Sequence, residues 1–179
     1  MNETPEQLKE QGQELFQRGD YDEALAAFEQ AAAEFAEQDN PVGQGEMLNN
    51  MGVIYRVQRE WETAVATLNQ AQTLFQQAGD VSRQAQTLGN LGDLHAARKN
   101  PDDAARCYSD AAALFAQQGD RDKQSQVLRA LSLLRLRQGY WLEAMMRMEE
   151  SLTVATRLGP GRWLFRWLLR FALGLFGGR

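Results

Sequence analysis

The stretch LNNMGVIY, from Leu48 to Tyr55, returns as LGNLGDLH at residues 88–95 and as LRALSLLR at residues 128–135. The three copies start forty residues apart, and each has an apolar residue at its first and fourth positions. A small residue, glycine or serine, follows at the fifth position of each copy. An internal repeat of this length indicates an architecture built from stacked copies of one structural unit.

Other residues recur at the same period and extend the repeat in both directions along the chain. An alanine lies twelve residues after each small residue, a large side chain lies four further on, and a phenylalanine and a glycine complete the pattern. These series are Ala24, Ala64, Ala104 and Ala144; Phe28, Leu68, Tyr108 and Met148; Phe35, Phe75 and Phe115; and Gly79, Gly119 and Gly159. The sequence therefore predicts four repeats.

Each repeat has the pattern of two helices joined by a short break. In the second repeat, Leu48, Met51 and Ile54 have the spacing of one helical face. The polar pair Arg59-Glu60 precedes a second amphipathic segment that starts at Trp61. Gly79 is able to take the left-handed conformation that ends a helix, and Asp80 is suited to cap the next one.

Small residues and a capping pattern support this helical reading. The sequence Thr4-Pro5-Glu6-Gln7 has the form of a capping box with proline at the first helical position. Gly52 on the first helix of a pair, with Ala64 and Ala71 on the second, predicts a close approach of the two backbones.

These residues resemble the tetratricopeptide repeat, whose pattern is W-x2-L-G-x2-Y…A-x3-F…P. The run Leu48-x2-Met51-Gly52-x2-Tyr55 followed by Ala64-x3-Leu68 fits this pattern, and the third repeat fits nearly as well. The closing proline is missing throughout, which implies that each second helix runs further than in the standard repeat. The chain is therefore similar to the long-repeat branch of the family, as in cell-polarity adaptors and kinesin light chains.

The resemblance implies an all-α fold, a right-handed superhelical solenoid of stacked antiparallel helix pairs closed by a C-terminal capping helix. We expect a solenoid domain over residues 1–159, followed by an amphipathic capping or anchoring helix over residues 160–179. The four tetratricopeptide-like repeats are expected at approximately 5–40, 41–80, 81–120 and 121–159.

In the family, the concave wall is made by the first helix of each pair and binds extended peptides or partner helices. The resemblance assigns this groove to the exposed turns of the first helices, and Asn50 and Asn90 match asparagines that hold a peptide backbone in long-repeat relatives. The alternative for both is a solvated polar residue. The predicted groove residues are Lys9, Gln13, Asn49, Asn50, Val53, Arg56, Asn90, Asp93, Arg129, Leu133 and Leu136.

The charge of the chain limits its partners. The formal net charge is −5, and residues 151–179 contain five arginines and no acid, which leaves about −10 on residues 1–150. Such a body repels phosphate backbones, so nucleic acid is not expected as a partner. A clamp for acidic C-termini is not expected either, because Gln13, Gln86 and Asn90 stand where further basic groups are needed.

Leu133 and Leu136 make one end of the groove more apolar, which suits an amphipathic helix or an apolar peptide.

Catalytic chemistry has little support, and we expect no enzyme activity, no cofactor and no metal. His95 is the single histidine and falls in a helix-packing column. Cys107 is the single cysteine, has no histidine partner in the pattern and is expected to be buried, in a protein of the cytoplasm. Gly43 and Gly45 are interpreted as residues of an inter-repeat turn.

The stretch RWLFRWLLRFALGLFGG, which starts at Arg162, continues the forty-residue register as one more first helix. On a helical wheel, a docking set toward the last repeat is expected at Leu164, Leu168, Phe171 and Leu175, with Arg162, Arg166 and Arg170 on the opposite side. The residues expected to remain for interaction are Trp163, Phe165, Arg166, Trp167, Leu169 and Arg170.

Three roles for this segment remain open, and they are able to coexist. It caps the solenoid, it docks at the inner face of a membrane or on an integral membrane protein, or it pairs with its own copy. An autoinhibitory plug in the chain's own groove is a further alternative. The sequence thus predicts a protein-binding scaffold or adaptor and, as the alternative, a peripheral scaffold or assembly protein of a membrane or membrane complex.

Overall fold

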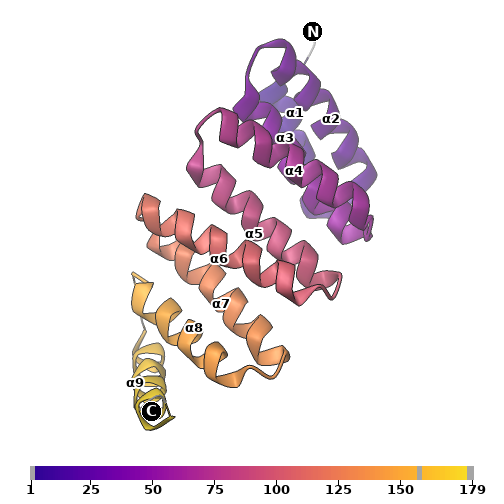
Figure 1. The fold of residues 1–179 in the computed structure, drawn as a ribbon. Coiled ribbons are helices and arrows are strands. Elements are labelled where there is room, and N and C mark those ends of the chain that lie inside the picture. The colour runs from indigo at the N-terminus through magenta and orange to yellow at the C-terminus, as the bar shows by residue number, and fades with distance from the viewer. Residues whose placement is uncertain (1–2, 157–158, 177–179) are drawn as a thin grey trace. The chain divides into compact units, whose positions relative to one another are not determined.

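The computed structural model describes residues 3–156 and 159–176, the side chains of Leu175 and Phe176 excepted, and every element in these ranges is a helix (Figure 1). The helices are α1 (Pro5–Arg18), α2 (Tyr21–Glu37), α3 (Pro41–Gln58), α4 (Trp61–Gln77), α5 (Val81–Ala97), α6 (Pro101–Gln118), α7 (Arg121–Arg137), α8 (Trp141–Val154) and α9 (Pro160–Phe176). The all-α fold class is confirmed.

The helix ends lie where the local sequence predicts them. Thr4 Oγ1 accepts a hydrogen bond from the amide of Gln7, and the Gln7 side chain accepts one from the amide of Thr4, which completes the capping box of α1. Gly79 has φ +69° after the end of α4, and Asp80 accepts from the amide of Arg83 at 2.9 Å. These caps satisfy backbone groups that a helix end otherwise leaves unpaired.

Glycines allow the two helices of a pair to approach. A Cβ atom on Gly52 of α3 would lie 2.6 Å from Leu68 Cγ of α4, and a Cβ on Gly12 of α1 would lie 2.6 Å from Phe28 Cε1 of α2. Phe28 and Leu68 are buried, so no free space exists for an added methyl group. The small residues that recur in the repeat therefore set the distance between paired helices.

The interpretation of Gly43 and Gly45 as turn residues is wrong. Both glycines lie inside α3 and are buried. A Cβ on Gly43 would lie 2.5 Å from Phe35, and a Cβ on Gly45 would lie 2.8 Å from Phe75. The two glycines thus seat one phenylalanine from each of the second helices α2 and α4.

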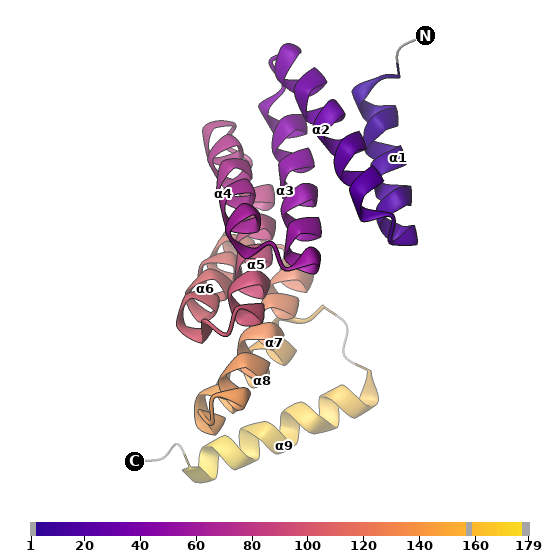
Figure 2. The same ribbon diagram turned by 90° about the vertical axis from the view of Figure 1, so that its right-hand side faces the viewer.

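The contacts of the chain divide it into two compact units, residues 1–94 and 95–179, and the boundary falls within α5. In the first unit, α1, α2, α3 and α4 pack in succession around a core that includes Leu8, Phe28, Phe35, Met47 and Ile54 (Figure 2). This succession of packed helices agrees with stacked helix pairs. The predicted division at residue 159 stays a prediction.

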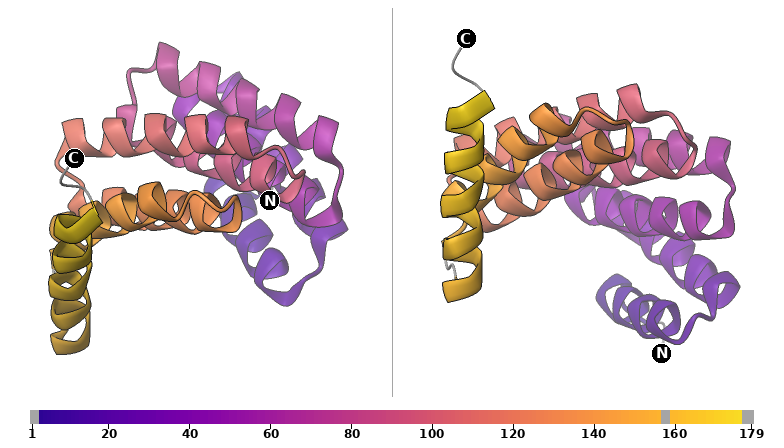
Figure 3. Two further views of the ribbon diagram at one scale, coloured as in Figure 1. Left: turned by 60° about the horizontal axis from the view of Figure 1, so that its bottom comes forward. Right: turned by 90° about the horizontal axis from the view of Figure 1, so that it is seen from below.

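In the second unit, α6, α7 and α8 pack in succession, and α9 crosses α8 (Figure 3). Tyr108, Leu131 and Leu134 belong to its core, and Ala144 on α8 is buried as well. Ser132 replaces the glycine of the other repeats and donates a hydrogen bond to the carbonyl of Ala144 at 2.7 Å. The hydroxyl is therefore satisfied inside the α7–α8 contact.

The docking face predicted for α9 is wrong. Leu164, Leu168 and Phe171 are exposed by 51%, 48% and 60%, whereas Leu169 is only 7% exposed and lies on the side of the helix that contacts α8. The side chain of Leu175, the fourth member of that set, lies outside the described residues. The forty-residue register predicts the position of the helix but not its rotation, because within the described residues α9 packs on α8 without a second helix of its own repeat.

Candidate functional site

The first unit carries a polar pocket of about 140 Å³ on its first helices. Its lining residues come from α1, α3 and α5, with Phe75 added from α4. The lining residues are Lys9, Gln13, Glu46, Asn49, Asn50, Phe75, Arg83, Gln86 and Thr87. Four of the residues predicted for the groove thus lie together in the polar pocket: Lys9, Gln13, Asn49 and Asn50.

An ion cluster forms one wall of the polar pocket. The carboxylate of Glu46 accepts a hydrogen bond from Lys9 Nζ at 2.6 Å and another from Arg83 Nε at 2.6 Å. A second guanidinium nitrogen of Arg83 pairs with Asp80 Oδ2 at 2.6 Å. Two cations therefore meet two carboxylates, and the wall is close to neutral.

The ionisation of this cluster follows from its contacts. Burial alone would raise the pKa of Glu46, but the hydrogen bonds from Lys9 and Arg83 outweigh it and hold this pKa below its usual range. Burial also acts to raise the pKa of Asp80, but the hydrogen bonds and the charge of Arg83 outweigh it and lower this pKa. Glu46 and Asp80 raise the pKa of Arg83 against the effect of its burial. These shifts keep Glu46, Asp80 and Arg83 charged at neutral pH.

A hydrogen-bonded network fixes the amide side of the polar pocket. Asn49 Oδ1 accepts from Thr87 Oγ1 at 3.1 Å and from Asn90 Nδ2 at 2.9 Å, and Thr87 Oγ1 also contacts the carbonyl of Arg83. Asn90, predicted to hold a peptide, uses its amide group to orient Asn49. Asn50 and Gln13, by contrast, form no side-chain hydrogen bond with any other described residue, so both carboxamides face the pocket with full bonding capacity.

A second, apolar pocket of about 100 Å³ adjoins the polar one. Phe16, Phe28 and Val53 supply its apolar walls, and Gln13 and Asn50 belong to both pockets. Two carboxamides thus stand at the border between a polar and an apolar pocket. The two carboxamides are able to form hydrogen bonds with a backbone amide group of a ligand. The adjoining pockets are able to hold one polar and one apolar side chain of the same ligand.

The other predicted groove residues are spread over both units. Arg56 on α3 has a buried Nε atom without a hydrogen-bond partner among the described residues, and Asp93 is exposed on α5. In the second unit, Arg129 is exposed on α7. Leu133 and Leu136 of the same helix are 44% and 57% exposed, which agrees with an apolar surface there.

The predicted interaction residues of α9 divide between its two sides. Trp163, Phe165 and Trp167 are about half exposed, while Leu169 is buried toward α8. Arg170 approaches Glu149 of α8 at 3.5 Å. Leu169, predicted as an exposed interaction residue, therefore belongs to the intramolecular contact.

A cavity of about 530 Å³ lies where α9 begins, between α7 and α8. Arg129, predicted for the groove, and Arg162 and Phe165 of α9 line the same cavity. Ser125 and Ser151 also line it and are hydrogen-bonded to each other at 3.1 Å. The start of α9 thus borders the same cavity as Arg129 of α7.

Several residues of the site were missed by reasoning from the sequence, namely Glu46, Arg83 and Thr87. The signal that could have identified two of them is a spacing: Lys9 and Glu46 are 37 residues apart, as are Glu46 and Arg83. This spacing joins a first helix to the next first helix, and opposite charges at it indicate a contact along the wall.

The residues weighed for catalysis lie in packed surroundings. Cys107 is buried, and this burial raises the pKa of its thiol. Burial likewise lowers the pKa of His95. Within the described ranges, no three histidine, cysteine or acidic side chains come together as metal ligands, and no helix is long and apolar enough to cross a membrane.

Comparison with protein families supports the repeat pattern directly. Family models described as "Tetratricopeptide repeat" match residues 10–33, 43–117 and 83–157. The chain belongs to the tetratricopeptide repeat family. This membership covers all four predicted repeats, and members with this fold typically serve as protein-binding scaffolds. A comparison with curated proteins gives no match.

Solved structures share the fold of this tetratricopeptide repeat protein at low identity. BtubC (BKLC) from P. vanneervenii aligns with a TM-score of 0.74 and 20% identity over 89% of this chain and 69% of that one. A putative kinesin light chain with nearly identical TPR-like repeats from Podosopora anserina aligns with a TM-score of 0.72 and 18% identity over 99% of this chain and 90% of its own.

The Rap protein complexed with Competence and Sporulation Factor also aligns, with a TM-score of 0.74 and 16% identity. The alignment covers 84% of this chain and 43% of the Rap protein, so this chain corresponds to less than half of that structure. Identities at this level establish the fold, and the function has to be argued from the site.

Proposed function

We propose that this tetratricopeptide repeat protein is a non-catalytic adaptor that binds an extended peptide of a partner protein in a groove formed by the polar and apolar pockets of the first unit. The observation that carries the proposal is the position of Gln13 and Asn50. Both carboxamides belong to both pockets and have no side-chain partner among the described residues. A carboxamide offers one donor group and one acceptor, which are the two needs of a peptide unit.

The shape of the groove favours an extended chain. Successive side chains of an extended peptide point to opposite sides, so a backbone held at Gln13 and Asn50 directs neighbouring side chains toward different pockets. The apolar pocket at Phe16, Phe28 and Val53 takes an aliphatic side chain, and the polar pocket takes a hydrogen-bonding one. We therefore expect ligands in which an apolar residue lies close to a polar uncharged residue.

The charge of the groove argues against a ligand recognised by its terminal carboxylate. Lys9 and Arg83 are the cations that such a carboxylate would need, and both already pair with Glu46. A ligand carboxylate would first have to separate one of these half-buried ion pairs. The new ion pair would only compensate for the one that was lost, so no net gain is expected. An internal peptide segment is thus a better ligand than a free C-terminus.

The structural neighbours support a binding role for the fold. The Rap protein, part of which has the same fold, was solved in complex with Competence and Sporulation Factor. For this chain we propose a protein partner in the cytoplasm.

A selection of linear peptides on the full chain tests the proposal. A displayed library of random peptides should yield sequences that bind the wild-type protein. Substitution Asn50→Ala should weaken them at least about fivefold, because each lost hydrogen bond contributes about 1 kcal/mol. Asn69→Ala is the matched control, since Asn69 is an exposed asparagine on α4, away from the groove. An empty selection, or peptides whose binding is indifferent to both Asn50→Ala and Gln13→Ala, would contradict the proposal.

A second candidate function is a scaffold held at a membrane or a membrane complex. One observation favours it: among the described residues, six large apolar side chains of α9 remain exposed after α9 has packed on α8. This function concerns the second unit alone and does not depend on peptide binding in the first.

A further inference from the structure

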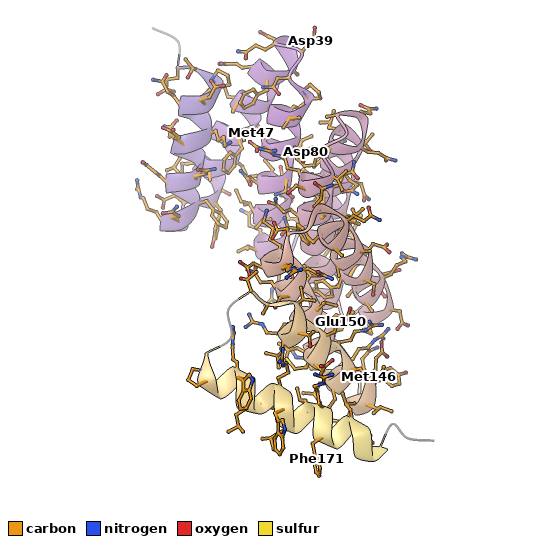
Figure 4. All side chains as sticks on the ribbon, turned by 90° about the vertical axis from the view of Figure 1, so that its left-hand side faces the viewer. Asp39, Met47, Asp80, Met146, Glu150 and Phe171 are labelled. Carbon is orange, nitrogen blue, oxygen red and sulfur yellow. The ribbon has the colours of Figure 1, made fainter. Side chains whose placement is uncertain are left out.

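One side of α9 forms an apolar surface that no other described element covers. This outward face consists of Trp163, Leu164, Trp167, Leu168 and Phe171, each of them between 48% and 60% exposed. Leu169 lies on the opposite side, at the contact with α8. Figure 4 shows Phe171 projecting from α9 on the side away from α8. The outward face is therefore distinct from the surface that holds α9 to its unit.

The outward face is continuous along the helix. Trp163, Trp167 and Phe171 follow one another at intervals of four residues, and the rings of Trp167 and Phe171 stack with centroids 6.0 Å apart. Leu164 and Leu168 extend the same surface around the helix. Exposed apolar patches of this kind usually mark a site of contact with a protein or a membrane.

Three arginines form a row beside the outward face. Arg162, Arg166 and Arg170 also recur every four residues, and a helix places them between the outward face and the side that contacts α8. Arg162 is exposed, Arg166 is partly exposed, and the Arg170 side chain remains 67% exposed beside Glu149. The row of positive charges beside the apolar surface thus suits a ligand that is both apolar and anionic.

A bilayer that contains anionic lipids has this combination of properties. Indole rings settle at the level of the lipid headgroups, aliphatic side chains enter the acyl region, and long arginine side chains reach the phosphates. No described helix is long and apolar enough to span the bilayer, so α9 would lie along its surface.

A second copy of the chain matches the outward face less well. Residues 151–179 contain no acidic side chain, so two α9 helices in contact would bring arginine rows together without a carboxylate from either helix. Like charges at an interface oppose association. The apolar residues alone fit both occupants, and the arginine row favours the lipid.

We propose that α9 docks on anionic membrane surfaces by inserting its outward face into the lipid interface, with Arg162 and Arg166 paired to lipid phosphates. The inference rests on the second candidate function and names its ligand as the lipid itself. It is independent of peptide binding by the first unit.

Vesicle flotation with the full chain tests this inference. The protein should float with vesicles of equal parts phosphatidylglycerol and phosphatidylcholine, float poorly with phosphatidylcholine alone, and detach as salt is raised. The double variant Trp167→Glu, Leu168→Glu should lose at least tenfold in binding. The control variant Ala113→Glu, Gln117→Glu adds the same charge on exposed positions of α6 and should float like the wild type. Circular dichroism of both variants verifies that they are folded.

The arginine row has its own test. Arg162→Gln and Arg166→Gln should each reduce binding to the anionic vesicles about fivefold and leave the weak binding to phosphatidylcholine unchanged. Equal loss on both kinds of vesicle would overturn the pairing with phosphates.

Absence of wild-type flotation, or flotation that the outward-face variant leaves intact, would overturn the inference. A wild-type dimer that the same variant converts to a monomer, without flotation, would assign the face to self-association and overturn it as well. Binding to detergent-solubilised membrane proteins without flotation would overturn the lipid ligand while keeping the second candidate function. None of these outcomes affects peptide binding.

Discussion

The carboxylate of Glu46 on α3 accepts a hydrogen bond at 2.6 Å from the ammonium group of Lys9 on α1. The same carboxylate binds Arg83 of α5, so one acid pairs with both cations that line the polar pocket, and Asp80 supplies the second carboxylate to Arg83. Glu46 therefore joins three consecutive first helices, and under the proposed function its charge also selects the ligands of the groove.

Substitution Glu46→Gln should convert the groove into a receptor for carboxylates. The change keeps the shape of the side chain but leaves Lys9 and Arg83 without their shared anion. A peptide with a free C-terminal carboxylate should bind this variant about tenfold more tightly than it binds the wild type, by fluorescence polarisation. The same peptide with an amidated C-terminus is the control and should show no gain. An equal gain for both peptides would refute the electrostatic explanation.

The contribution of Glu46 to stability should depend on pH. Its pKa is lowered in the folded state, so the stabilisation is complete above the pKa of the unfolded state and is lost as pH falls through the folded value. We expect Glu46→Gln to lower the free energy of unfolding by about 1 kcal/mol at neutral pH. Urea titrations of both proteins should show this difference shrinking below about pH 4. A difference that stays constant or grows in acid would contradict the assignment.

Gly52 and Gly89 provide a matched test of close helix packing. Gly52→Ala should destabilise the protein by about 1–3 kcal/mol, because the added Cβ would lie 2.6 Å from the buried Leu68 side chain. Gly89 lies within α5, and an added Cβ there meets no atom within 4 Å. Gly89→Ala should therefore stabilise the protein by about 0.5–1 kcal/mol. Urea denaturation measures both, and similar effects from the two substitutions would speak against the packing argument.

Leu168 and Leu169 test which side of α9 meets α8. Leu169→Ala removes the buried side chain of the contact and should cost about 2 kcal/mol of local stability. The amides of α9 should then exchange with deuterium faster in mass spectrometry. Leu168→Ala truncates an exposed neighbour and should leave exchange almost unchanged. The opposite ranking would restore the face predicted from the repeat register.

The repeated columns predict much of the fold because each of them records a local packing need. Gly52 faces Leu68, and Gly79 ends α4 in the left-handed conformation, as the pattern indicates. The rotation of α9 could not be predicted, since every side of that helix except the arginine row is apolar. Residues 164 and 169 are both leucines, so the sequence does not distinguish them. Only the contact of Leu169 with α8 shows which of the two is buried.

The candidate site was predictable in part for a related reason. The pattern of the family places Lys9, Gln13, Asn49 and Asn50 on exposed turns of first helices, and all four line the polar pocket. The family pattern does not indicate which of the polar side chains form hydrogen bonds with one another. The bond from Asn90 to Asn49 depends on the stacking of α5 against α3, a long-range contact that no single repeat encodes.

Photo-crosslinking of a selected peptide tests the central claim most directly. Benzoylphenylalanine in place of Val57, which is 41% exposed one turn beyond the apolar pocket on α3, should capture the peptide in high yield. The same group in place of the exposed Ala66 on α4 should capture almost none. Capture at Ala66 in preference to Val57 would place the ligand on the second helices and contradict the proposed groove.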